Sequence, residues 1–411
     1  MGIARRDFLK SVGGVTLAGG LFAGTTPRAA EQPAMPAFAF ADDRVPMNAA
    51  NLCPMPNLVS AAVRRLGADL DRDMSGPNRR RIESMKEEAR ARIAALLGVG
   101  ADEIAIVRNT SEANNTIVQG FPARPGDEIL LWDQNHPSNG VAWDVIAARA
   151  GCSVRRFSVA PDAASVDRVV DLFKDAIGPK TRVVSFTHIS NITGFRLPAR
   201  EICEAIRNRG DIYIHIDGAQ TWGAAEVNLR ELGCDSFSGS AHKWFMGPRE
   251  TGILYVHERS IERIWPNVVS VPWGDEAQTS QIGARKFEAF GQRNDAGIAA
   301  LVEAARMHEA ITPAGIERRS MAISDYLREG LADLGVPMLS PAGPPFASSV
   351  VILKAAADNA AGMVDEVLKD SGVIGAAVNG FRLSPHIYNT RDHIDRVLAS
   401  IGRFRNRLQA A

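Results

Sequence analysis

Cysteine is scarce in this chain, which has only four cysteines among its 411 residues. They are far apart and lie in mostly apolar sequence, so we expect buried free thiols at Cys53, Cys152, Cys203 and Cys234. No Cys-x-x-Cys pair and no Cys/His cluster points to a metal site. An excess of one charge is also lacking, since 47 Lys and Arg residues balance 47 Asp and Glu residues. This balance argues against a nucleic acid or a membrane surface as the partner.

Long apolar runs are missing as well. The weakly apolar, glycine-rich run from Val12 to Ala23 is too short for a membrane-spanning helix. It follows Ala4–Lys10 (ARRDFLK), which resembles the twin-arginine export signal, and small residues at 37–41 offer cleavage sites. We therefore expect a twin-arginine signal peptide at 1–41, a periplasmic or exported protein, and no further membrane segment.

Strands and helices are predicted to alternate from about residue 103 to residue 256. Such alternation is typical of a mostly parallel sheet with helices on both faces. A Trp/Pro/Gly-rich region at 265–296 follows, and then helices with short strands near 348–353 and 380–384. The length and the 45% hydrophobic content allow two domains or more. After the signal peptide we expect an N-terminal segment at 42–70, a large α/β domain at 71–296 and a small α+β domain at 297–411.

The stretch 213–256 organises the expected site. An apolar run from Tyr213 ends on Asp217, and the next short apolar stretch leads to Lys243. An acid and a lysine are thereby placed at the ends of neighbouring strands, each followed by small residues. Pyridoxal phosphate (PLP) needs a lysine for its Schiff base and an acid for its pyridinium nitrogen. A lone Asp or Lys would be a helix cap or a solvated side chain, whereas the ordered set favours the cofactor.

The motifs around these two residues resemble the class V aminotransferase family of fold-type-I PLP enzymes. The family's Asp-x-Ala-Gln turn is matched at 217–220, and its Ser-x-His-Lys and Gly-Pro motifs are matched at 240–243 and 247–248. The resemblance covers about residues 45–408. It implies a large, mostly parallel sheet domain with a smaller α+β domain, and a homodimer with both active sites at the interface. Among the implied cofactor-binding residues are Ser240 and His242.

Further cofactor contacts are expected at strand ends. Thr110 and Ser111 open a helix after the strand at 103–107, where free N–H groups and the helix dipole favour phosphate. The same residues also suit a helix cap, and the two roles are compatible. The resemblance implies that His136 stacks on the pyridine ring, and that Asn191 and Gln220 hydrogen-bond near the phenolic oxygen of the cofactor.

Three residues are expected farther from the ring. Arg382, in the stretch RLSPHIYNT, matches the family's strand end and would grip a substrate α-carboxylate through two parallel hydrogen bonds. A structural ion pair is the alternative for this arginine. Asn51 belongs to an Asn/Pro turn that resembles a substrate-side motif. Gln292 stands where the family has a threonine that reaches the phosphate of the partner subunit, so this chain departs from the pattern there.

The expected substrate is a small molecule, an amino acid or an amino-acid-like compound. Lys243, Asp217 and His136 are the expected catalytic residues, with Lys243 as the base for the Cα proton. The chain has no cysteine after Cys234, which disfavours the cysteine-dependent chemistry of the family's desulfurases.

Epimerisation, transamination and C–S β-elimination remain, with His386 and Tyr388 as possible second acids. The sequence motifs HPSN, HKW and RLSPHIYNT resemble those of the isopenicillin N epimerase-like branch. An inactive PLP-binding protein is a further alternative, which the intact Lys243, Asp217 and Arg382 disfavour.

Overall fold

The structure is a computed structural model that describes residues 35–159, 165–270 and 283–408. Most of the predicted signal peptide therefore lies outside the described residues. Within the described part of the chain, no helix is both long and apolar enough to cross a membrane. The same residues contain no group of three or more His, Cys, Asp or Glu side chains arranged to hold a metal ion.

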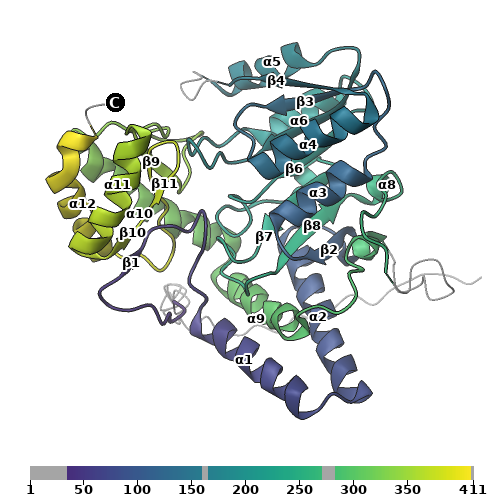
Figure 1. Cartoon of the computed structure of the whole chain (residues 1–411), viewed down its shortest axis with the longest axis horizontal. Helices are drawn as coiled ribbons and strands as arrows, with labels where there is room; N and C mark the ends of the chain where they lie inside the picture. The colour runs from purple at the N-terminus through teal and green to yellow at the C-terminus, as the bar shows by residue number, and fades with distance from the viewer. Residues whose placement is uncertain (1–34, 160–164, 271–282, 409–411) are drawn as a thin grey trace, which may run out of the picture. The chain divides into compact units, whose positions relative to one another are not determined.

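A seven-stranded sheet forms the centre of the larger part of the chain (Figure 1). Its strands are β2 (Ile104–Val107), β3 (Glu128–Trp132), β4 (Ser153–Phe157), β5 (Thr181–Thr187), β6 (Tyr213–Asp217), β7 (Ser236–Ser240) and β8 (Gly252–Val256). Their order is β2-β8-β7-β6-β5-β3-β4, and β8 runs antiparallel to both of its neighbours. All other neighbouring pairs are parallel, so the mostly parallel sheet predicted from the sequence is confirmed.

Helices cover both faces of this sheet. Alternate residues of a strand point to opposite faces, and the apolar residues on each face pack against helices. Ile129 and Leu131 of β3 pack in the cluster that contains α3 (Thr110–Gly120) and α4 (Pro137–Ala150). Leu130 and Trp132 pack on the other face. The helices on that second face include α5 (Val166–Ala176), α6 (Ala199–Arg207) and α2 (Gly76–Leu96). On β6, His215 and Asp217 follow the alternation of Tyr213 and so face α3 and α4.

The C-terminal part builds a second, smaller sheet. Its antiparallel strands are ordered β11-β12-β9, with β9 at Val351–Leu353, β11 at Ala376–Ala377 and β12 at Phe381–Leu383. The helices α10 (Pro313–Asp333), α11 (Ala357–Ser371) and α12 (Arg391–Phe404) pack around it (Figure 1). β12 carries Arg382, so this sheet places the predicted carboxylate-binding residue.

Two segments link the parts of the described chain. β1 (Val45–Pro46) pairs in parallel with β10 (Val373–Ile374), which ties the N-terminal segment to the C-terminal sheet region. The helix α9 (Asp295–Ile311) packs against both α1 (Asn57–Arg72) and α2. The remaining short helices are η1 (Ala101–Glu103), α7 (Leu229–Leu232), α8 (Glu258–Ile261), η3 (Gly283–Phe287) and η4 (Arg405–Arg407). The predicted domain boundaries stay predictions.

Candidate active site

A cavity of about 190 Å³ opens at the carboxyl ends of β5, β6 and β7. It is lined by Asn109, Thr110, Ser111, His136, Ser138, Thr187, Asn191, Asp217, Ala219, Gln220, Ser240, His242 and Lys243. Most of the site residues predicted from separate motifs are therefore brought together in one place. This position is the usual one for ligands of open α/β sheets.

Lys243 lies in the turn that follows β7 and is partly buried. Burial lowers the pKa of its amine to about 8, although the nearby Asp217 carboxylate acts in the opposite direction. The uncharged fraction of the amine near neutral pH is thus far larger than for an ordinary lysine, and the uncharged amine is the form that attacks a carbonyl and accepts a proton. His242, beside it, has a pKa lowered to about 4 by burial and by the Lys243 charge, so its imidazole is neutral.

Asp217 ends β6 with only 1% of its surface exposed. Its Oδ1 accepts a hydrogen bond of 3.0 Å from the backbone N–H of Ala219, and its Oδ2 accepts one of 2.9 Å from Nδ2 of Asn114. The turn after it requires glycine, because a Cβ on Gly218 would lie 1.9 Å from the ring of Phe237. The close packing of this turn fixes the carboxylate at the cavity wall.

The N-terminus of α3 forms another wall. Asn109 caps the helix, its Oδ1 accepting from the N–H of Glu112 at 3.0 Å. Ser240 holds the first turn, since its Oγ accepts from the N–H of Thr110 at 2.8 Å and bonds to Oγ1 of Thr110 at 2.8 Å. Ser111 follows at an exposed position that lines the cavity. A helix N-terminus facing a cavity suits a phosphate group.

His136 caps α4 and lines the cavity from a neighbouring helix end. Its Nδ1 accepts from the backbone N–H of Ser138 at 3.2 Å and lies 2.9 Å from that residue's hydroxyl. Burial lowers the pKa of the ring, so the imidazole is neutral with its proton on Nε2. The ring is held in place by these contacts, which suits a flat side chain that stacks on a cofactor.

Gln220 is engaged at both ends of its amide. Its Nε2 donates to the carbonyl of Ala50 at 3.0 Å, and its Oε1 accepts from Nε1 of Trp244 at 2.7 Å. The side chain thereby ties the N-terminal segment to the turn that carries Lys243. The predicted contacts of Gln220 and Asn191 with the phenolic oxygen stay predictions, although both residues line the cavity.

Arg382 is 4% exposed, and no described acidic side chain forms an ion pair with it. Its two terminal nitrogens donate to the Asn191 carbonyl and to Oδ1 of Asn48, both at 3.2 Å, while its buried Nε has no partner. Burial alone lowers the pKa of this guanidinium to about 10. The charge of Arg382 lowers the pKa of both Lys243 and His136, so both side chains lie close enough to interact with it. A buried charge without a counter-ion is costly and suits an anionic ligand.

Neither Asn51 nor Gln292 is among the residues that line the cavity. Asn51 is exposed, whereas Asn48, three residues earlier, makes the contact to Arg382. Gln292 is exposed, and its Nε2 donates to the carbonyl of Arg293 at 3.1 Å and to Asp295 at 2.9 Å. A single chain does not test a contact with the phosphate of a partner subunit, so that role of Gln292 stays a prediction.

The two suggested second acids are corrected by the structure. His386 is fully buried, with Nδ1 2.9 Å from the Ser320 hydroxyl and Nε2 2.8 Å from the Trp244 carbonyl. Burial lowers its pKa to about 3, and both ring nitrogens are occupied. The hydroxyl of Tyr388 lies 3.6 Å from Sγ of Cys53, and burial raises its pKa well above the usual range. Neither side chain lines the cavity around Lys243.

The cavity-side residues that are absent from the sequence prediction include Asn109, Asn114, Ser138 and Thr187. Asn114 lies one helical turn after Thr110 and so shares its helix face, a spacing that could have indicated it. Thr187 is the last residue of β5 and pairs in register with Asp217. Its buried hydroxyl lines the cavity and has no hydrogen-bond partner. An orphaned hydroxyl beside the cavity calls for a polar ligand.

These residues fit PLP. The cavity offers an amine of lowered pKa, a buried carboxylate, a helix N-terminus for a phosphate, a flat neutral imidazole and the unsatisfied hydroxyl of Thr187. Lys243 would hold the cofactor covalently, and Asp217 would face its ring nitrogen.

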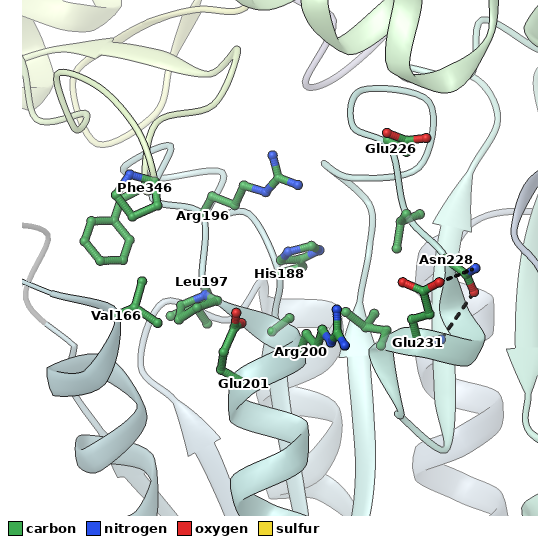
Figure 2. A pocket seen from close by; sticks show the side chains of 15 residues that line it. Val166, His188, Arg196, Leu197, Arg200, Glu201, Glu226, Asn228, Glu231 and Phe346 are labelled. Atoms are coloured by element: carbon green, nitrogen blue, oxygen red, sulfur yellow. Dashed lines mark hydrogen bonds between the residues drawn. The ribbon is translucent and has the colours of Figure 1, made fainter.

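A second and larger hollow, of about 290 Å³, borders the loop that follows β5 and begins at His188 (Figure 2). In this view the imidazole of His188 lies between Arg196 and Arg200. Burial lowers the pKa of His188 to about 3, and Arg196 pairs with Glu317 at 2.5 Å. We assign the cofactor to the smaller cavity, because Lys243 and Asp217 line that cavity and not this hollow.

The comparison with known proteins shows the family of this chain. A family model described as Aminotransferase class-V matches residues 68–397. The chain belongs to the class V aminotransferase family. The isopenicillin N epimerase of Streptomyces clavuligerus is 28% identical over 335 residues, which cover 77% of this chain and 84% of the relative. The cysteine desulfurase of Serratia proteamaculans (strain 568) is 27% identical over 353 residues, which cover 78% and 83%.

Solved structures show the same fold. A cystine C–S lyase in complex with its reaction product cysteine persulfide has a TM-score of 0.81 at 24% identity, over 88% of this chain and 98% of that one. A mutant of that lyase holds glycine covalently linked to its PLP cofactor. The apo cysteine desulfurase from Thermococcus onnurineus NA1 has a TM-score of 0.78 at 22% identity, over 89% and 95% of the two chains.

The class V chain is therefore a PLP-dependent enzyme of fold type I, as its motifs predict. The relatives include both epimerases and desulfurases, so family membership alone leaves the reaction open. The export signal and the homodimer stay predictions.

Proposed function

We propose that this enzyme epimerises or racemises an amino acid, or an amino-acid-like compound, at its α-carbon. The observation that carries the proposal is the buried Arg382 without an acidic partner, within electrostatic range of Lys243. A guanidinium in this state recognises a carboxylate through parallel charge-assisted hydrogen bonds. A substrate carboxylate held by Arg382 would bring its α-carbon toward Lys243, which fits a substrate with both groups on one carbon.

PLP supplies the electron sink that makes an α-proton of an amino acid acidic. The chain supplies the positions around that proton. Lys243, with its pKa lowered to about 8, accepts the proton at its Nζ. Asp217 provides the negative charge at the cavity wall, and His136 provides a flat neutral surface. Arg382 orients the substrate by its carboxylate.

Cysteine-dependent desulfuration has little support in this cavity. All four cysteines lie within the described residues, and none of them lines the cavity around Lys243. Cys53 contacts the turn that carries Lys243, since its backbone N–H donates to the His242 carbonyl at 2.9 Å. Burial raises the pKa of its thiol to about 12, so it is not a thiolate nucleophile at neutral pH.

Two alternatives keep the same parts. Transamination needs Lys243 alone as acid and base, and C–S β-elimination needs an acid near the leaving sulfur. Epimerisation is favoured by the likeness to the isopenicillin N epimerases of Streptomyces clavuligerus and Amycolatopsis lactamdurans, each 28% identical to this chain. It requires a proton donor on the face opposite Lys243, and the contacts of His386 and Tyr388 leave neither available for that task.

A panel assay with three product channels tests the proposal. The PLP-loaded enzyme is incubated separately with the L and D forms of proteinogenic amino acids, cystine and amino-acid-containing peptides. Chirality, keto acid and sulfide are followed in the same samples. We expect inversion at the α-carbon without keto acid or sulfide. Stoichiometric keto acid would instead establish transamination, and sulfide or persulfide would establish the lyase alternative.

We further propose that the enzyme is exported through the twin-arginine route and that it works as a homodimer. Export is supported by the segment ARRDFLK at 4–10 followed by the mild apolar run. That route carries folded proteins, which suits an enzyme that binds its cofactor before export. The dimer is supported by the family resemblance and by the Trp/Pro/Gly-rich segment at 265–296, which has too many special residues for a plain linker. Light scattering of the active enzyme tests it, and a fully active monomer would contradict it.

A further inference from the structure

A set of buried polar side chains lies directly behind the Asp217 carboxylate. Asn114, His215, Ser236 and Ser238 are each 0% exposed, and we call them the support network. His215 stands two residues before Asp217 on β6 and so shares its face of the sheet. In register, His215 faces Ser236 and Asp217 faces Ser238, while Asn114 approaches the same face from α3.

The hydrogen bonds of the support network have one consistent set of directions. The amide of Asn114 donates from Nδ2 to Oδ2 of Asp217 at 2.9 Å and to the Ser138 hydroxyl at 3.3 Å. A carboxylate only accepts, so Oδ1 of Asn114 must point away from it and act as an acceptor. That oxygen receives the Ser238 hydroxyl at 2.6 Å and Nε2 of His215 at 3.0 Å.

His215 completes the arrangement. Burial lowers its pKa to about 4, so the ring is neutral and carries a single proton. The network assigns this proton to Nε2, where it is donated to Asn114, and leaves Nδ1 to accept from the Ser236 hydroxyl at 2.8 Å. The amide of Asn114 is therefore held from behind by two donors and cannot turn its oxygen toward Asp217 without losing both.

Both hydrogen bonds to the Asp217 carboxylate come from uncharged donors, the Asn114 amide and the Ala219 N–H. A lysine or arginine in place of Asn114 would neutralise the carboxylate, and an apolar residue would leave a buried charged oxygen without its donor. We infer that Asn114, oriented by His215 and Ser238, is a positioning residue for the cofactor. It holds the Asp217 carboxylate at the cavity wall and stabilises its charge without neutralising it.

The inference rests on the predicted contact between Asp217 and the ring nitrogen of PLP. The titratable groups within electrostatic range of Asp217 are Lys243, His136 and His215. Of these, only Lys243 carries a substantial positive charge near neutral pH. When Asp217 keeps its charge, the ring nitrogen keeps its proton, and that positive ring repels a proton on the Lys243 nitrogen. If the charge of the Asp217 carboxylate is less well stabilised, the ring nitrogen loses its proton more easily and repels the Lys243 proton less. The Lys243 nitrogen then keeps its proton to higher pH.

The test compares Asn114→Leu with Asn115→Leu, a control one residue farther on α3 whose amide donates to the Ser111 carbonyl instead. Without substrate, two quantities are measured on each PLP-loaded variant: the dissociation constant of PLP and the pH midpoint of its visible absorbance change. For Asn114→Leu we expect the dissociation constant of PLP to rise about tenfold. We also expect the pH midpoint to rise by about one unit, because one pKa unit corresponds to the same tenfold change in an equilibrium constant. The control should match the wild type.

Further variants keep the inference testable whatever happens to Asn114→Leu. Ser238→Ala removes one of the two donors that orient Asn114, and we expect a smaller shift of the midpoint in the same direction. Asp217→Asn should shift it most, and an unchanged midpoint there would overturn the premise about Asp217. A folded Asn114→Leu or Ser238→Ala with wild-type values, or an equal shift in Asn115→Leu, would overturn the positioning role. None of these measurements depends on which reaction the enzyme catalyses.

Discussion

Replacing Arg382 by lysine or glutamine should separate carboxylate recognition from every other property of the site. Arg382 is buried, donates only to neutral oxygens at 3.2 Å, and has an unsatisfied Nε. Arg382→Lys keeps a charge but loses one of the two parallel hydrogen bonds to a carboxylate. A hydrogen bond to a charged group contributes about 1.5–3 kcal/mol. We therefore expect kcat/KM for amino acids to fall by about 10- to 150-fold.

Arg382→Gln removes the charge itself and leaves the substrate carboxylate buried without a partner. Truncation of one member of a buried charge pair costs about 2–5 kcal/mol. The expected loss is then about 30-fold to several thousand-fold. The visible spectrum of the bound cofactor should stay nearly unchanged in Arg382→Lys, which keeps the charge. In Arg382→Gln the pH midpoint of the absorbance change should rise, because the Arg382 charge lowers the pKa of Lys243.

The assay measures kcat/KM for an amino acid and, separately, the binding of the same amino acid and its amide through the cofactor spectrum. Arg328→Lys is the matched control, since Arg328 is also 4% exposed but pairs with Asp325 at 2.9 Å. It should lower thermal stability without changing the preference for the free carboxylate. Equal losses for the amino acid and its amide in Arg382→Lys would show that Arg382 is structural, and the carboxylate assignment would be wrong.

Three other predictions concern Lys243 and export. Borohydride should trap PLP on Lys243, as peptide mass mapping would show, and Lys243→Met should abolish trapping; an adduct on another lysine would contradict the assignment. Burial lowers the pKa of Lys243 from 10.5 to about 8, so PLP should bind apoenzyme faster as pH rises through about 8, and rates independent of pH would disagree. Arg5→Lys combined with Arg6→Lys should retain the precursor in the cytoplasm, as cell fractionation would detect.

The same pKa shift has a consequence for stability. The folded state disfavours the charged amine, so the unfolded state binds the Lys243 proton more tightly. Stability of the apoenzyme is then lost as pH falls from 10.5 to about 8, and Lys243→Met should unfold at a higher temperature than the wild type at neutral pH. This stored cost is typical of a side chain kept for reactivity.

Local patterns predicted most of the strands well. β6 at Tyr213–Asp217 has the predicted bounds, and β2 at Ile104–Val107 lies within the predicted strand at 103–107, because a short apolar run marks a buried strand clearly. α1 has no counterpart among the predicted elements. Its buried residues Val59, Ala62 and Leu66 follow helical spacing, but charged residues and a glycine dilute the pattern.

The cavity itself was predictable where a motif is local. Lys243 and Ser240 belong to one turn, and Thr110 and Ser111 to one helix start. The contacts that decide how the site works are not local. Asn114 and Asp217 are 103 positions apart, and Arg382 and Asn48 are 334 positions apart. Sequence spacing carries no information on such pairs until the fold brings them together.

The suggestion for the second acids failed for a related physical reason. His386 and Tyr388 stand close to Arg382 in the sequence, but β12 ends at Leu383, so the alternation of a strand no longer sets the direction of either side chain. Arg382 reaches the loop after β5, whereas His386 turns into the core against Ser320 and the Trp244 carbonyl. Proximity along the chain therefore did not translate into proximity to the cavity.

The most direct test of the proposed reaction is a single-enantiomer experiment in deuterium oxide. The PLP-loaded enzyme receives one enantiomer of the best binding amino acid, and chirality, α-deuterium content, keto acid and sulfide are followed together. The account predicts that the opposite enantiomer accumulates with deuterium at its α-carbon, and that Lys243→Met stops both changes. Exchange of the α-proton with full retention of configuration, or release of keto acid or sulfide in amounts that match the substrate consumed, would contradict it.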